Sequence, residues 1–478
     1  MRLLLMLFVA VWLFGFELQK EIAIEGRYYF TPALGSDEVA AFGYISKVRP
    51  TKEEIEKERA FLKKLIEEGV RREYGSWEEY ERTIKKAAKE ATEGAPAWQK
   101  VLMPPSLVEE AAPLLMRGLV ETAIAHPELS TEPLGSVGRC GVVLLDEKGD
   151  YRTIPLGMNM PVVWLSFSPD GRYLAVLSDA SVEGADKRLK VAGRIDVIDV
   201  AKRRPVQSYL FANAVDQIDF SPDGRYLAFM VQDPKKWSKR ALRFIDTATW
   251  RVTEKIVPFE TLIISGSEPE GKNYRRPYFR FTKDGDLCLR MRDRSIECKR
   301  FADGRRFFAT KGGGGYFDLS SRRPRLVDEM GREYDYEAGR LLYTYPRFDK
   351  KWPWWQVRYL HDGTRIVAVD LLHQLRLLEE GREIARFDRL SSLRGPKVIF
   401  LDPLDRYVYG FATDEPQKYV SYKGTLHREK RRLRAYRVPD MQPVFDVGFD
   451  KGSAVDGAAT KNRLFVSGFE TIRIYSLN

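Results

Sequence analysis

Strand-length alternations of apolar and polar residues, separated by turn residues, run from about residue 137 to the C-terminus. Such runs, bounded by glycine, proline and aspartate, predict β-structure. The run FSPDGRYLA occurs at 167–175 and again at 220–228, and weaker copies occur at 281–289, 301–309, 359–368 and 400–410. The pattern therefore predicts a repetitive β-rich region over 137–478.

The repeated run has the chemistry of a tight hairpin turn. Pro169 fixes φ at the second turn position, Asp170 tolerates the next conformation, and Gly171 supplies a left-handed residue that rejoins the strand. Two further strands are expected after each strong copy, for example at 194–199 and 205–211. Four strands in a repeat of about 40–55 residues predict one blade of a β-propeller.

These residues resemble the WD40-like, TolB-like and YVTN-type β-propeller repeats, whose copies share a strand, an S-P-D-G-[RK] turn and a strand reading apolar-Ala. The resemblance covers 137–478, with two strong copies, and it implies a fold while saying little about function. TolB itself has an α/β N-terminal part, whereas the pattern here is helical. A Tol-type role is therefore not implied.

The fold class expected from the pattern is mainly β, with a propeller of about seven blades and an N-terminal helical subdomain. The closing blade would combine strands at 454–477 with strands near 141–156. Six or eight blades stay open because 286–345 is poorly patterned. The other six blades are expected at 162–211, 215–258, 277–308, 314–345, 355–388 and 396–447.

Helical signals occupy 51–130, after a short β-rich lead-in at 17–50. A serine or threonine followed three residues later by glutamate is a capping box, which begins a helix. Three such boxes occur, at Thr51, Ser76 and Ser106. With the apolar spacing they predict helices at about 52–68, 77–92 and 107–125.

The first 16 residues combine Arg2 with an apolar run from Leu3 to Phe16. This run suits a secretory signal peptide and is short of the roughly 20 residues that span a bilayer. An uncleaved N-terminal anchor and a buried apolar element are the alternatives. Export to the periplasm or the cell exterior is the expected location.

The amino-acid composition bears on the temperature at which the protein works. The chain holds only five asparagines and nine glutamines among its 478 residues, with abundant lysine, arginine and glutamate. Depletion of thermolabile amides and enrichment of ion-pairing residues indicate a thermophilic source.

The sequence holds no recognisable catalytic or metal-binding motif. Its four histidines, His126, His361, His373 and His427, have no metal-ligand spacing, and H-E-x-x-H, phosphate-loop and nucleophile-elbow motifs are missing. We therefore expect no cofactor and no metal, and a binding protein is preferred over an enzyme. A propeller enzyme with a site over the central channel is the alternative.

Three segments, 233–240, 346–355 and 414–434, are basic and aromatic, and they hold most of the formal net charge of +11. Because strands alternate in direction, all three should lie at the blade ends opposite the S-P-D-G turns. This long-loop rim is the candidate surface for a protein or an anionic envelope component, with nucleic acid a poor fit to export. The alternative is ordinary solvated loop charge. The candidate partner-binding residues are Lys235, Lys236, Trp237, Lys239, Arg240, Lys350, Lys351, Trp352, Trp354, Trp355, Tyr422, Arg428, Lys430, Arg431, Arg432 and Arg434.

Cys288 and Cys298 are equidistant from Asp293 in an expected hairpin. They should therefore face each other across two antiparallel strands, at a separation that a disulfide accepts. We hypothesise a bridge there, with Cys140 outside it; two reduced cysteines are the alternative.

Export predicts removal of the apolar N-terminal run. Sequencing the N-terminus of protein from its native source should begin near residue 17. Recovery of intact Met1 from a soluble cytoplasmic fraction would contradict export.

Overall fold

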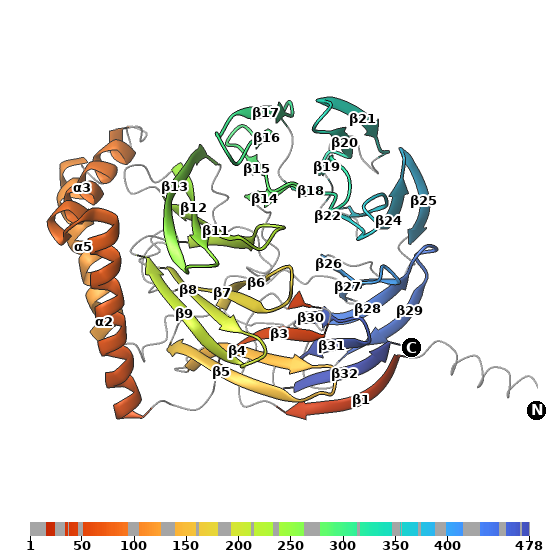
Figure 1. Cartoon of the computed structure of the whole chain (residues 1–478), viewed down its shortest axis with the longest axis horizontal. Coiled ribbons are helices and arrows are strands. Elements are labelled where there is room, and N and C mark those ends of the chain that lie inside the picture. The colour runs from red at the N-terminus through yellow and green to blue at the C-terminus, as the bar shows by residue number, and fades with distance from the viewer. Residues whose placement is uncertain are drawn as a thin grey trace, which may run out of the picture. The chain divides into compact units, whose positions relative to one another are not determined.

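The structure is a computed structural model. It describes residues 16–23, 34–36, 38–45, 51–93, 105–125, 139–158, 162–179, 193–211, 215–232, 239–261, 278–312, 316–346, 354, 356–370, 374–387, 398–413, 431–448, 456–468 and 471–477. Within these ranges the chain is mainly β and forms a β-propeller of eight four-stranded blades (Figure 1).

Six blades coincide with the repeats expected from the sequence, and each is an antiparallel meander of consecutive strands. The first two are β6 (Val162–Phe167), β7 (Tyr173–Asp179), β8 (Gly193–Asp199) and β9 (Arg204–Phe211), then β10 (Val215–Phe220), β11 (Tyr226–Gln232), β12 (Lys239–Asp246) and β13 (Arg251–Glu260). The next two are β14 (Phe279–Phe281), β15 (Leu287–Arg290), β16 (Ile296–Lys299) and β17 (Arg306–Ala309), then β18 (Phe317–Leu319), β19 (Arg325–Asp328), β20 (Arg332–Asp335) and β21 (Arg340–Thr344). The last two are β22 (Gln356–Tyr359), β23 (Ile366–Val369), β24 (Leu375–Glu379) and β25 (Arg382–Phe387), then β26 (Val398–Leu401), β27 (Tyr407–Thr413), β28 (Arg431–Arg437) and β29 (Pro443–Val447).

The remaining strands make two blades where one was expected, so the number of blades is eight instead of the preferred seven, within the range of six to eight that the sequence left open. One blade has the order β1 (Phe16–Ala23), β32 (Thr471–Leu477), β31 (Arg463–Ser467) and β30 (Asp456–Ala459). The other has the order β2 (Leu34–Gly35), β3 (Val39–Ile45), β4 (Arg139–Asp146) and β5 (Tyr151–Met158).

The miscount has a structural cause. Residues 17–50, expected as a separate lead-in, supply three blade strands. β1 joins the C-terminal strands, whereas β2 and β3 form a blade with β4 and β5, in which β3 is the neighbour of β4. β1 pairs antiparallel with β32, so that Phe16 lies opposite Leu477 and the first and last described strands are neighbours (Figure 1).

The three helices of the described ranges lie in the connection between β3 and β4. They are α2 (Lys52–Tyr74), α3 (Trp77–Glu93) and α5 (Pro105–Ala125). Thr51 caps α2 in the expected capping box, but the helix runs past the predicted end at 68 and stops at Gly75, whose φ is +81°. Ser106 lies inside α5 and therefore does not cap it. None of the described helices has the length and apolarity needed to cross a membrane.

The S-P-D-G turn has the geometry that its residues predict. Gly171 has a φ of +69° and its N–H donates to the Ser168 carbonyl over 2.8 Å. Asp170 accepts from the Ser168 hydroxyl at 2.6 Å and from the Arg172 N–H at 3.1 Å. Each turn therefore satisfies its own polar groups.

Cys288 lies directly opposite Cys298 in the β15–β16 ladder. Both are buried, and the structure joins their sulfur atoms in a disulfide. Cys140 is buried in β4, outside that bridge.

The chain divides into two compact units. The first contains Met1–Phe42, Leu144–Arg152 and Tyr274–Asn478, and the second contains Gly43–Val143 and Thr153–Asn273.

We predict that Phe16 stabilises the sheet that joins the two ends of the chain. Its ring is half-buried, stacks on Phe445 at 4.3 Å and lies 5.0 Å from Tyr407. Phe16→Ala should therefore cost about 1–3 kcal/mol of unfolding free energy. Leu18→Ala, on the same strand but 49% exposed, should cost less than about 1 kcal/mol. Denaturant unfolding of chains that retain residue 16 compares the two, and equal losses would contradict the prediction.

Candidate functional site

Five of the predicted partner-binding residues have described side chains: Lys239, Arg240, Trp354, Arg432 and Arg434. Arg431 is described only as the first residue of β28. The others lie outside the described residues: Lys235, Lys236, Trp237, Lys350, Lys351, Trp352, Trp355, Tyr422, Arg428 and Lys430.

The described arginines are paired within their own blades. Arg240 is 6% exposed, and its Nε lies 2.8 Å from an Asp216 carboxylate oxygen. Arg434 is 2% exposed and shares the carboxylate of Asp446 with Arg432, at 3.0 and 2.6 Å. A buried charge needs such a partner. These arginines hold strand ends in place and contribute little free positive charge.

The remaining two described residues are also engaged. Trp354 is 1% exposed, its backbone N–H donates to the Glu329 carbonyl, and its ring packs near Tyr345. Lys239 is half-buried, and its Nζ lies 3.7 Å from Glu260. Trp354 is therefore part of the core, while Lys239 stands at the edge of a loop.

The long connections fall at one end of their blades. In every blade the first turn, which carries the S-P-D-G run or its equivalent, lies at one end, and the connection between the second and third strands lies at the other. The long connections 46–138, 180–192, 233–238 and 414–430 are all of the second kind. The connection that contains the helices is also of this second kind. The sequence analysis did not predict this because it did not identify β2 and β3 as blade strands.

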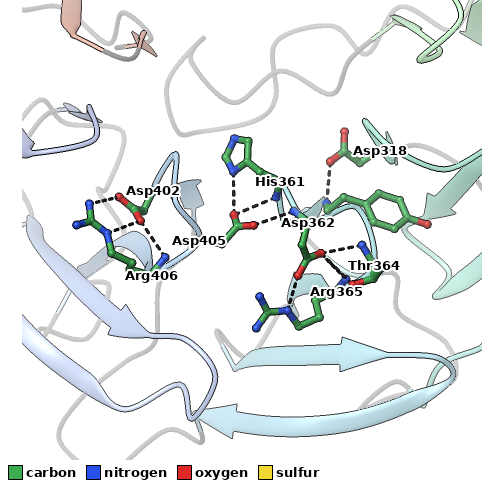
Figure 2. A network of polar contacts seen from close by, with 9 residues as sticks. Asp318, His361, Asp362, Thr364, Arg365, Asp402, Asp405 and Arg406 are labelled. Carbon is green, nitrogen blue, oxygen red and sulfur yellow. Dashed lines mark hydrogen bonds and ion pairs between the residues drawn. The ribbon is translucent and has the colours of Figure 1, made fainter.

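At the opposite blade ends, a polar cluster joins neighbouring turns (Figure 2). The carboxylate of Asp405, in the β26–β27 turn, accepts from the backbone N–H groups of His361 and Asp362 at 2.9 and 2.8 Å. The imidazole Nδ1 of His361 lies 2.8 Å from the same carboxylate. Asp405 therefore holds the β22–β23 turn of the preceding blade.

Other carboxylates of the cluster hold their own turns. Asp402 is fully buried and binds the Nε and Nη2 of Arg406 at 3.0 Å each. Asp362 accepts from the backbone N–H groups of Thr364 and Arg365 at 2.7 and 3.0 Å. Figure 2 shows both carboxylates directed back at the turns that carry them.

The β22–β23 turn is also held from its other side. The Ser320 hydroxyl, after β18, donates to the Gly363 carbonyl at 2.8 Å. Asp318 accepts from the Tyr359 N–H at 2.9 Å. One turn is thus fixed by both neighbouring blades.

Polar contacts between neighbouring blades also occur on the innermost strands. The side-chain amide of Gln356 in β22 accepts from the Ile399 N–H at 2.8 Å and donates to its carbonyl at 3.1 Å. Arg280 in β14 lies 3.2 Å from Asp318 in β18. The sequence analysis did not predict these residues. A polar residue at the start of a buried strand or within it, such as Gln356, was the signal that could have identified them.

His361 is the one histidine whose side chain the structure describes in this cluster, and 52% of that side chain is exposed. Its hydrogen bond to Asp405 raises the pKa of His361 above the usual value. Partial burial opposes this rise, and the charges of Asp405, Asp402 and Asp318 add to it.

The cluster is better suited to holding blades than to catalysis. The nearby hydroxyl of Ser320 bonds to the Gly363 carbonyl, and that of Thr364 bonds to Asp362, so neither is positioned on the imidazole as a nucleophile would be. Within the described ranges, no group of three histidine, cysteine, aspartate or glutamate residues could hold a metal ion.

Comparison with known proteins finds no protein family whose model matches the chain and no similar curated protein.

We predict a pH-dependent contribution of the His361–Asp405 pair to stability. Because the folded-state pKa of His361 is raised, the contribution is full below the unfolded value of about 6.5 and is lost as pH rises through the folded value. Because half of the His361 side chain is exposed, this contribution should not exceed about 1 kcal/mol.

The measurement is chemical denaturation between pH 5 and 9, on wild type and on His361→Gln. Glutamine can still donate to Asp405 but does not titrate, so this variant should lose the fall in stability that wild type shows above neutral pH. Parallel profiles for the two proteins would show that the pair contributes nothing.

Proposed function

We propose that the protein is a binding or scaffold protein that engages its partner through the loop ends of its blades. A β-propeller supports such a role in general. The observation that carries the proposal is the placement of the long connections, including the one that contains α2, α3 and α5, at the blade ends opposite the tight turns. Binding residues concentrate on loops that a rigid scaffold presents.

The turn ends are less available for this role. Their polar side chains cap tight turns or join adjacent blades, as Asp405, Asp362 and Ser320 do. A partner that competed for these groups would have to break contacts between blades.

The proposed partner is a protein or an envelope component with an anionic surface. Segments 233–240, 346–355 and 414–434 supply lysine, arginine and tryptophan, which combine long-range attraction with rigid apolar contact. Arg240, Arg432 and Arg434 support these segments from the strand ends, through Asp216 and Asp446. We assign direct contact with the partner to the other lysine and arginine residues of these three segments.

The proposed setting is outside the cytoplasm. It rests on Arg2 and on the apolar run that follows it, which are typical of export signals. The amide-poor composition adds a thermophilic source to the proposal.

Charge reversal at four loop residues tests the proposal. We predict that Lys235→Glu, Lys236→Glu, Arg428→Glu and Lys430→Glu together weaken binding to immobilised heparin, used as a polyanion probe, by about tenfold or more at ~0.1 M salt. The melting temperature should stay nearly unchanged because these residues precede the strands and the paired Arg240, Arg432 and Arg434 are left intact. Elution salt and thermal unfolding are the two measurements.

The matched control reverses four exposed arginines that begin outer strands at the turn ends: Arg204, Arg251, Arg340 and Arg382. It changes the net charge of the chain by the same amount. Binding that responds equally to both quadruple variants would reflect total charge and would refute a loop-end surface.

A further inference from the structure

Helix α5 carries an apolar stripe that faces solvent. Leu107, Leu114 and Leu115 are 59%, 73% and 48% exposed, and Ala111 between them is exposed as well. Leu114 is the most exposed of the large apolar side chains in the described ranges. The spacing of these residues places them on one side of the helix.

The other side of α5 is already in use. Pro113 is buried, and α5 contacts α3 and α2. Arg117 binds Glu81 of α3 at 2.9 Å, and its guanidinium lies 5.8 Å from the centre of the Trp77 ring. The helix is therefore apolar on a packed face and on an open one. Contiguous exposed apolar surface of this kind marks an interaction site.

Gly118 is a second, independent sign of a close neighbour. It lies one helical turn after Leu114 and is exposed, and a Cβ built on it would meet nothing within 4 Å. Glycine weakens a helix relative to alanine, and no contact among the described residues explains its presence. A glycine on an exposed stripe lets a second helix approach closely.

The charges beside the stripe indicate what that second helix is. Glu110 and Arg117 are both exposed, and seven residues separate them, so they lie on the same flank of α5. In an antiparallel helix pair, each flank meets the same flank of the other helix. With a two-fold axis between Pro113 and Leu114, Glu110 of each copy would lie opposite Arg117 of the other, whose guanidinium also binds Glu81 and Glu121 of its own copy at 2.9 Å each.

The same flank argues against a membrane surface. It contains Glu110 and Glu121 with Arg117 as the positive charge, whereas helices that lie on membranes are rich in lysine and arginine on their polar face. A two-fold contact between identical helices would bury the apolar stripe and bring the opposite charges of its flank together.

We propose that α5 of one copy packs antiparallel against α5 of a second copy, and that this contact makes the chain a weak homodimer. Leu114 lies next to the two-fold axis, and the Gly118 position allows the backbones to approach. A single helix pair buries little area, so the dimer should dissociate in about the micromolar range. The proposal concerns assembly and is independent of the loop-end binding function.

Sedimentation velocity of the full chain at ~1–100 µM is the first test. Wild type should pass from monomer to dimer with concentration. Leu114→Glu should raise the dissociation constant at least about tenfold, and Glu110→Arg, which would face Arg117 with a like charge, should also weaken the dimer. The matched control is Leu404→Glu, at a 52% exposed leucine in the β26–β27 turn, which should leave dimerisation unchanged.

Crosslinking provides a second test if Leu114→Glu fails to fold. Leu114→Cys should form a disulfide-linked dimer under mild oxidation, because the two copies of residue 114 lie beside the axis; Leu404→Cys should not. The proposal is overturned if wild type stays monomeric up to ~100 µM and the two cysteine variants crosslink alike. It is overturned equally if the chain stays monomeric while Leu114 mediates binding to vesicles or to a different protein.

Discussion

Contacts between adjacent blades are the constraint on which the rest of the structure depends. The inner strand of a blade buries backbone and side-chain polar groups that must find partners within the protein. Gln356 satisfies both backbone groups of Ile399 with a single amide, and Asp318 accepts from the Tyr359 backbone while binding Arg280. Asp405 does the same for the His361 turn. Blade order is thus fixed by directional bonds as well as by apolar packing.

Because of these contacts, the two ends of each blade have different roles. At the turn ends, short connections place carboxylates where they cap one turn and clamp the next, which leaves little freedom for insertion or for binding. At the loop ends, the connection between the second and third strands is the one that varies most in length from blade to blade. The longest of these connections joins β3 to β4 and contains α2, α3 and α5, and β3 and β4 still lie side by side in one blade.

Ion pairs limit how much of the positive charge of the chain a partner would meet. Arginine is abundant, but many arginines in the described ranges are held by carboxylates, from the buried pair of Arg240 with Asp216 to the exposed pair of Arg473 with Glu21. Paired arginines contribute little to the field that a partner meets. The formal net charge therefore matters for binding only where segments such as 414–434 concentrate it beyond the paired strand ends.

Local chemistry in the sequence determined the repeat. The turn around Gly171, six of the blades and the facing positions of Cys288 and Cys298 depend on residues close together in the chain, so their patterns could be read directly. Tertiary structure decided what depends on distant partners: that β1 pairs with β32, that β2 and β3 complete a blade across the helical insertion, and that Arg434 is buried against Asp446. An alternating run specifies a strand and its buried face, but it does not specify the neighbour. The neighbour is chosen by the packing of the whole propeller.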